Sequence, residues 1–73
     1  MAFVMINAEV GAEREVLNAL RKLNNVKEAY MAYGVYGLLV KLEAETMEKV
    51  KEAVASLRRL DRIRSTLTIP VRE

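Results

Sequence analysis

The stretch from Ala29 to Leu42, AYMAYGVYGLLVKL, gathers the residues of this chain that are most suggestive of a small-molecule site. It contains three tyrosines, and Gly34 and Gly37 bracket only Val35 and Tyr36. Glycines let a backbone approach a ligand closely, and they also supply the geometry of tight turns. The stretch therefore indicates either a structural hairpin or the edge of a binding site.

Catalytic chemistry has few candidates in this sequence. There is no histidine and no cysteine, which removes the commonest general base, the thiol nucleophile and disulfides. Asp61 is the only aspartate, and no glycine-rich phosphate loop is present. Three carboxylates in or beside predicted strands are expected to be solvated: Glu28, Glu43 and Glu45. We therefore expect no enzymatic activity, no catalytic residue, no metal site and no cofactor.

The charge pattern does not favour nucleic acid or an anionic membrane as a partner. Twelve Lys and Arg nearly balance ten Asp and Glu, for a net charge of +2. A basic cluster lies around a predicted helix end, where the helix dipole and solubility account for it: Arg58, Arg59, Arg62 and Arg64. The predicted central strands offer only Phe3 as an aromatic, fewer than an RNA-recognition module of this fold presents. We expect no direct DNA binding and no membrane binding.

Length and composition indicate one small domain over residues 1–73. A domain of this size buries only about 60% of its unfolded surface, so a partner is expected to add stability. No hydrophobic run is long enough to span a bilayer, and we expect a cytoplasmic protein. The absence of Gln and Cys beside plentiful Lys, Arg and Glu is typical of thermophile proteins.

Hydrophobic periodicity predicts the elements of the first half of the chain. Apolar runs indicate strands at Ala2–Ile6, Val26–Tyr33 and Leu38–Ala44, the last two forming a hairpin around Gly34–Gly37. Helical spacing predicts a helix over Glu13–Leu23. Asn24 and Asn25 are expected to end it, because Asn tolerates a left-handed backbone.

The second half repeats the pattern with a helix and a strand. Thr46 is the predicted cap of a helix whose apolar stripe is Met47, Val50, Val54 and Leu57. Residues 62–71 alternate, which predicts a strand with Ile63, Leu67, Ile69 and Val71 on one side. Pro70 cannot donate a ladder hydrogen bond, so this strand is expected at a sheet edge.

An internal echo organises these elements. The segment LRKLNNV from Leu20 resembles LRRLDRI from Leu57, at an offset of 57 − 20 = 37 residues. Each copy covers a helix end, a turn and a strand start, so the chain is predicted to contain strand-helix-strand twice. Two interlocking units of this kind give a ferredoxin-like βαββαβ fold, an α+β class. The fold has a four-stranded antiparallel sheet with both helices on one face.

This fold leaves the second face of the sheet without a cover. An exposed face should carry polar residues at alternate strand positions, but FVMI and LLV carry none. A second copy of the chain is the simplest cover, so the sequence predicts a dimer packed sheet against sheet.

With these elements placed, the chain resembles the ligand-binding and oligomerisation domain of the Lrp/AsnC transcription regulators, often called the RAM domain. The resemblance rests on AFVMINAEVGAEREVLNAL, VKEAYMAYGVYGLLVKLEA and STLTI, which span almost all of the sequence. Family members typically carry Gly-acid-Tyr-Asp between the second and third strands. Here the segment reads Gly34-Val35-Tyr36-Gly37, so the Gly and Tyr match and both acidic positions are lost.

The resemblance implies a site and an assembly. Amino acids bind at interfaces between dimers in the family, near the hairpin and the last strand, which implies this ligand-binding set: Gly34, Val35, Tyr36, Gly37, Thr66 and Thr68. It also implies a homo-oligomer, a dimer or an octameric ring of dimers. Family members usually carry a DNA-binding helix-turn-helix, which this sequence lacks. Hetero-assembly with a full-length Lrp/AsnC regulator is therefore a further expected partnership.

Three functions remain open from the sequence. The first is a non-enzymatic amino-acid-sensing and oligomerisation domain that modulates a full-length transcription regulator. The second is an ACT-like regulatory domain, which shares the fold and binds amino acids but pairs its subunits side by side. The third is a purely structural interaction module without a small-molecule ligand.

The loss of the two acidic residues also affects the affinity that we expect for an amino acid. In the family, an aspartate after the Tyr pairs with the α-ammonium group of the ligand, and Gly37 cannot supply that charge. A hydrogen bond to a charged group contributes about 1.5–3 kcal/mol. We therefore expect weak or altered amino-acid binding: a hydrophobic or unusual ligand, or none.

Overall fold

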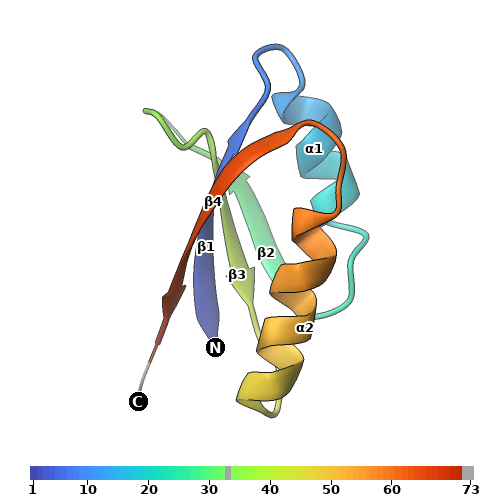
Figure 1. Ribbon diagram of the computed structural model, residues 1–73, viewed down its shortest axis with the longest axis vertical. Coiled ribbons are helices and arrows are strands. Elements are labelled where there is room, and N and C mark those ends of the chain that lie inside the picture. Colours follow the sequence, from blue (N-terminus) through green and yellow to red (C-terminus); the bar gives the residue numbers. More distant parts are fainter. Residues whose placement is uncertain (33, 72–73) are drawn as a thin grey trace.

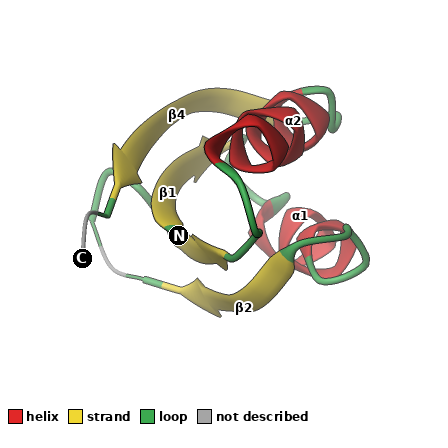
Figure 2. Cartoon of the chain, turned by 90° about the horizontal axis from the view of Figure 1, so that it is seen from below, coloured by secondary structure: helices red, strands yellow, loops and turns green. Residues whose placement is uncertain are grey.

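The structure is a computed structural model that describes residues 1–32 and 34–71. Its elements follow the order β1 (Ala2–Ala8), α1 (Glu13–Leu20), β2 (Val26–Met31), β3 (Leu38–Leu42), α2 (Met47–Arg58) and β4 (Ile63–Pro70). The four strands form one antiparallel sheet, and both helices lie on the same side of it (Figure 1, Figure 2). This confirms the predicted ferredoxin-like fold.

The sheet has the strand order β2-β3-β1-β4, so β1 and β3 are central. The predicted β2–β3 hairpin is confirmed, although β2 ends at Met31 and the expected last residue, Tyr33, lies outside the described residues. β4 is an edge strand, as Pro70 predicts, and Pro70 pairs with Ala2 of β1.

Strand alternation gives the sheet one covered and one open face. On β1, Val4 and Ile6 are fully buried beneath the helices, whereas Phe3 and Met5, which alternate with them, are partly exposed. Residues that pair across strands share a face. The buried face packs against α1 and α2 and forms the core of the domain, in which the largest fully buried side chains are Ile6, Leu20, Leu38, Leu42, Leu57, Val4, Val16 and Val40.

Helix α1 is shorter than the sequence predicts. It ends at Leu20 rather than Leu23, because the next amides make tighter bonds: Leu23 N–H donates to the Leu20 carbonyl at 3.1 Å. Asn25 then takes a left-handed backbone with φ of 70°, which confirms its expected role in ending this segment. The buried side of α1 consists of Val16, Leu17 and Leu20.

Helix α2 begins as predicted, because the Thr46 hydroxyl oxygen accepts a hydrogen bond from Lys49 N–H at 3.2 Å. Its buried residues are Val50, Ala53 and Leu57. Met47 remains 46% exposed, so the predicted apolar stripe is wrong at its first residue.

Strand β4 corrects one further expectation. The pairing of β1 with β4 shifts register between Asn7 and Ala8, and Ile63 pairs with Ala8 beyond this bulge. Ile63 therefore packs against the core, whereas Leu67 and Ile69 lie on the open face. The prediction that all three face the same way is wrong because the bulge reverses the alternation.

In the described part of the chain, no helix is long and apolar enough to cross a membrane.

Candidate functional site

The loop between β2 and β3 carries four of the six residues that the resemblance assigns to a ligand. Ala32 N–H donates to the Gly37 carbonyl at 2.8 Å, which closes the loop across its base. Val35 is 77% exposed at the tip, and Tyr36 is half-buried. The loop thus presents an apolar side chain, an aromatic ring and exposed backbone at one end of the sheet.

The two glycines of this loop have different reasons to be glycine. Gly34 has a φ of +112°, a conformation that side-chain-bearing residues rarely adopt. Gly37 has no such strain, and a Cβ added there would meet only the Glu13 side chain, at 3.8 Å from its Cγ. Turn geometry therefore accounts for Gly34 but not for Gly37.

The two threonines of the predicted set lie elsewhere in the chain's fold. Thr66 pairs with Ile6 and Thr68 with Val4, so both lie on the helix-covered side of β4. β1 lies between β4 and β3, the strand that begins directly after Gly37, so β4 is roughly 10 Å from β3 at the usual strand spacing. Within one chain the structure does not bring the threonines to the glycine loop.

One carboxylate near the loop was not identified from the sequence. Glu13 opens α1 and lies 24 residues before Gly37, yet its Cγ lies 3.8 Å from the position that a Cβ on that glycine would take. Only the tertiary fold brings these residues together, because the β1–α1 junction and the β2–β3 loop meet at the same end of the domain. In the sequence, Glu13 has the appearance of an ordinary acidic residue in the first turn of a helix.

The open face of the sheet carries a set of apolar side chains that the helices do not cover. One row of paired residues crosses all four strands: Tyr30, Leu39, Met5 and Leu67. The next row contains Glu28, Lys41, Phe3 and Ile69. Tyr30, Leu67 and Ile69 are each exposed by 45% to 49%. The centre of this face is thus apolar, as FVMI and LLV predict.

The β2 side of the open face has a polar border. The Tyr30 hydroxyl donates to Glu28 Oε1, and Lys41 Nζ lies 3.8 Å from Glu28 Oε2. The hydrogen bond to the Glu28 carboxylate raises the pKa of Tyr30 above its ordinary value, with smaller contributions from desolvation and from the charge of Glu28. These contacts fix the orientation of the tyrosine ring at the margin of the apolar surface.

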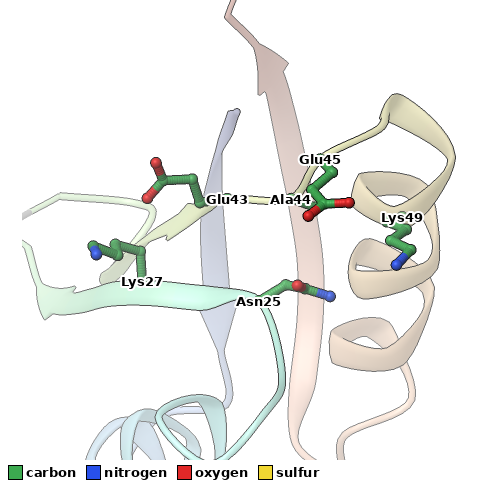
Figure 3. A pocket seen from close by; sticks show the side chains of 6 residues that line it. All are labelled: Asn25, Lys27, Glu43, Ala44, Glu45 and Lys49. Atoms are coloured by element: carbon green, nitrogen blue, oxygen red, sulfur yellow. The ribbon is translucent and has the colours of Figure 1, made fainter.

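Two surface depressions lie away from the glycine loop. Figure 3 shows the larger, of about 570 Å³, which has Lys27 and Glu43 on one side, Glu45 and Lys49 on the other, and Asn25 between them. A second, of about 250 Å³, is an apolar groove between α2 and β4, with Met47, Val50 and Val54 on one side and Thr68 and Pro70 on the other. Thr68 thus borders a groove within its own chain.

The charged residues considered for catalysis lie at the surface. Glu28, Glu43 and Glu45 are exposed, which confirms the expectation that they are solvated, and Asp61 is exposed as well. Arg58, Arg59, Arg62 and Arg64 are exposed as well, and Arg62 Nε pairs with Glu15 Oε2 at 3.0 Å. Among residues 1–32 and 34–71, no group of three or more acidic side chains is placed to hold a metal ion.

Comparisons with known proteins agree with the fold. The family model described as the Lrp/AsnC ligand binding domain matches residues 1–73. The crystal structure of FFRP-DM1 is 36% identical with a TM-score of 0.87, over 93% of this chain and 92% of that one. The hypothetical protein PHS023 from Pyrococcus horikoshii is also 36% identical with a TM-score of 0.87, over 99% of this chain and 89% of that one.

A longer protein shares the fold. AsnC from E. coli superimposes with a TM-score of 0.89 at 24% identity, over 99% of this chain but only 50% of AsnC. The comparison with curated proteins gave no significant match. The match over all 73 residues and the identity to FFRP-DM1 carry the assignment. The chain belongs to the Lrp/AsnC ligand binding domain family.

Proposed function

We propose that this chain is a non-enzymatic amino-acid-sensing and oligomerisation domain that modulates a full-length Lrp/AsnC transcription regulator. Membership of a family of regulatory ligand-binding domains supports this class. The absence of His and Cys and the exposure of the candidate carboxylates support a binding role over catalysis. Small secreted domains commonly depend on disulfides, so the lack of cysteine supports a cytoplasmic location.

The open sheet face is the observation that carries the oligomerisation part of this proposal. Met5, Leu39 and Leu67 form an apolar row that the helices do not cover. The chain exposes 5193 Å² of surface, whereas a compact monomer of 8.3 kDa exposes about 4,600 Å². A second copy packed face to face would bury the apolar row. The proposed unit is a sheet-to-sheet dimer, with octameric rings of dimers as the larger assembly.

The separation of the threonines from the glycine loop supports a ligand site between copies. Gly37 directly precedes β3, and β1 lies between β3 and β4, so Thr66 and Thr68 lie at least two strand spacings, roughly 10 Å, from Gly37 in one chain, too far for the backbone groups of one amino acid to contact both. A site that uses both groups would combine the loop of one copy with β4 of another. In this proposal Gly34, Val35, Tyr36 and Gly37 form one wall, and Thr66 and Thr68 belong to a neighbouring copy.

The partner proposed for regulation is a full-length family member that carries a DNA-binding domain. Such a protein would present the same kind of open sheet face, so a mixed dimer could form through it. Amino-acid binding would then change the assembly of the DNA-binding partner without direct DNA contact by this chain.

Two measurements on the purified chain test the proposal. Light scattering at micromolar concentration should report an assembly well above 8.3 kDa. Calorimetric titration with the twenty standard amino acids should identify at least one that binds. A monodisperse monomer would refute the oligomerisation role, and an assembled protein that binds none of them would leave a purely structural interaction module as the function.

The ACT-like alternative makes a different prediction about the same assembly. Side-by-side pairing would join edge strands or helices and leave Met5 and Leu39 exposed to solvent. Sheet-to-sheet pairing would protect them. Solvent accessibility of Met5 to a mild oxidant, measured by mass spectrometry of the assembled protein, separates the two arrangements.

A further inference from the structure

Glu13 lies directly beside the one loop glycine that backbone geometry does not require. Its Cγ is 3.8 Å from the position that a Cβ would take at Gly37. Its Oε1 accepts a hydrogen bond from Gly11 N–H at 2.9 Å, which anchors the carboxylate at the start of α1. The side chain is half-buried, so it is held in place and still reachable.

The charge of Glu13 is not matched by a cation in the described structure. The ion pairs among residues 1–32 and 34–71 join Lys41 to Glu28 and Arg62 to Glu15, and no Lys or Arg nitrogen there lies within 4.0 Å of Glu13. Glu15, in the same helical turn, forms an ion pair with Arg62. Glu13 thus offers a carboxylate that is held by Gly11 N–H, on a side chain whose Cγ lies next to the loop.

The missing side chain at Gly37 keeps the space beside Glu13 open. Because Gly37 has no positive φ and a Cβ would make only ordinary contact, an alanine or larger residue could occupy that position. The glycine therefore leaves a gap bounded by the loop backbone and the Glu13 stem. A ligand that reaches the backbone of Gly37 would meet this carboxylate.

We propose that Glu13 is the anionic partner of the α-ammonium group of an amino acid bound at the Gly34–Gly37 loop. This assignment rests on the proposed function of the loop as an amino-acid site. Val35 and Tyr36 offer no negative charge to an ammonium, whereas Glu13 comes close to the loop from another element. The ligand class that fits is an α-amino acid with a free amino group, rather than a simple carboxylic acid.

This assignment changes the expectation about affinity that was based on the loop alone. The sequence suggests that an ammonium would lack an anionic partner, because Gly37 carries no carboxylate. The fold places one beside Gly37 from 24 residues earlier in the chain. Ordinary binding of a standard amino acid is therefore expected.

The test compares the native assembled protein with Glu13→Gln and with Glu15→Gln by calorimetric titration. Glu15→Gln is the matched control, because it removes a carboxylate from the same helical turn that already pairs with Arg62. The probes are the twenty standard amino acids and, for the tightest binder, the carboxylic acid that lacks its amino group. Light scattering of each variant establishes that assembly is intact.

Glu13→Gln should weaken binding of the amino acid roughly ten- to a hundredfold, and Glu15→Gln should leave it within about twofold. The native protein should prefer the amino acid over its deaminated analogue by a similar factor, and Glu13→Gln should abolish that preference. A merely structural role of Glu13 would weaken both ligands equally. Unchanged affinity in Glu13→Gln, or an equal loss for both ligands, would overturn the assignment.

A rescue experiment tests the location of the charge. Gly37→Asp would place a Cβ 3.8 Å from Glu13 Cγ, so its combination with Glu13→Gln should restore part of the lost affinity, because the regained charge outweighs the several-fold loss from filling the space beside Gly37. Failure of the double variant to bind better than Glu13→Gln would count against a charge at this place. A native protein that assembles but binds none of the twenty amino acids would instead refute the proposed function of the loop, and this assignment with it.

Discussion

Asn25 and Arg62 occupy equivalent positions in the two halves of the fold. They are separated by 62 − 25 = 37 residues, the offset of the sequence echo, and their φ angles are 70° and 71°. Each follows a helix and precedes the next strand, β2 in one case and β4 in the other. The chain thus turns from helix to strand twice, each time through one residue with a left-handed backbone.

The hydrogen bonds before these residues repeat as well. Lys22 N–H donates to the Ala19 carbonyl at 3.2 Å, and Arg59 N–H donates to the Ser56 carbonyl at 3.2 Å. Leu23 and Leu60 make the equivalent next bonds, each at 3.1 Å. The echo in the sequence therefore records a repeated helix-to-strand connection and not merely two amphipathic helices.

Arg62→Gly is expected to stabilise the protein. A left-handed backbone costs an ordinary residue about 1–2 kcal/mol, which glycine avoids at an entropic cost of about 0.5–1 kcal/mol. The lost ion pair with Glu15 is exposed and contributes little. The net gain in the free energy of unfolding should be about 0.5–1 kcal/mol, measured by denaturant titration at constant protein concentration.

Asn24→Gly is the control for this prediction, because Asn24 does not have a positive φ. It should lower the free energy of unfolding by a few tenths of a kcal/mol or more, since glycine adds only unfolded-state entropy there. Stabilisation by Asn24→Gly, or destabilisation by Arg62→Gly, would show that the left-handed conformation is not the cause.

Met5→Lys is expected to disrupt the assembly and leave the fold intact. Met5 lies in the apolar row at the centre of the open face and is partly exposed in the single chain, so a lysine fits there in a monomer. Buried without a partner in a sheet-to-sheet dimer, that charge would cost roughly 3 kcal/mol, about a hundredfold in dissociation constant. Analytical ultracentrifugation over a concentration series measures the shift.

Ala55→Lys supplies the matched control, because Ala55 is exposed on α2 and the substitution adds the same charge. It should assemble like the native chain. If both variants dissociate equally, net charge rather than the open face controls assembly, and if neither does, the copies meet through another surface.

Tyr30 is expected to ionise above the ordinary pH range of tyrosine. The hydrogen bond to Glu28 raises its pKa above 10.0, so Glu28→Gln should move its titration back towards that value. The folded form favours the protonated phenol, so this contribution to stability is present below pH 10.0 and is lost as the pH rises through the folded-state pKa. Ultraviolet titration of the native protein minus Tyr30→Phe isolates the phenol.

Glu43→Gln provides the comparison, because it removes an exposed carboxylate near the end of β3. It should leave the Tyr30 titration unchanged. An identical curve for native protein and Glu28→Gln would mean that this hydrogen bond does not persist in solution.

Local sequence signals predicted the fold because each one depends on residues that are adjacent in the sequence. Thr46 caps α2, Pro70 marks an edge strand, and FVMI with LLV identified the two central strands. The side of Ile63 was not predictable, because the bulge opposite Asn7 and Ala8 depends on pairing between strands far apart in the sequence. The proximity of Glu13 to Gly37 could not be predicted from the sequence for the same reason, since no pattern within α1 or the loop links the two residues.

The candidate site likewise has features that the local sequence predicts and features that depend on contacts between distant residues or between copies. Gly34 could be identified as a turn residue from its neighbours, and its φ of +112° agrees. Whether Thr66 and Thr68 join it depends on how copies meet, which a single chain's periodicity does not encode. The apolar open face predicts that copies meet, but side-chain alternation alone does not specify the register between them.

The last prediction separates the two loop glycines. Gly34→Ala should lower the free energy of unfolding by about 1–2 kcal/mol, because its φ of +112° strains any residue with a Cβ, although no atom lies within 4 Å of the added methyl. Gly37→Ala should leave stability unchanged or raise it by up to about 1 kcal/mol, because it restricts the unfolded chain without strain in the folded one. Its methyl would, however, fill the gap beside Glu13 and should weaken amino-acid binding several-fold.

Denaturant titration and calorimetry on the two variants together test this division of roles. The expected pattern is a stability loss in Gly34→Ala and an affinity loss without a stability loss in Gly37→Ala. If Gly37→Ala is instead the destabilised variant, the loop backbone differs from the described one. If its stability and affinity both match the native protein, the space beside Gly37 is not where the ligand lies, because the added methyl would occupy that space in ordinary contact with the Glu13 side chain.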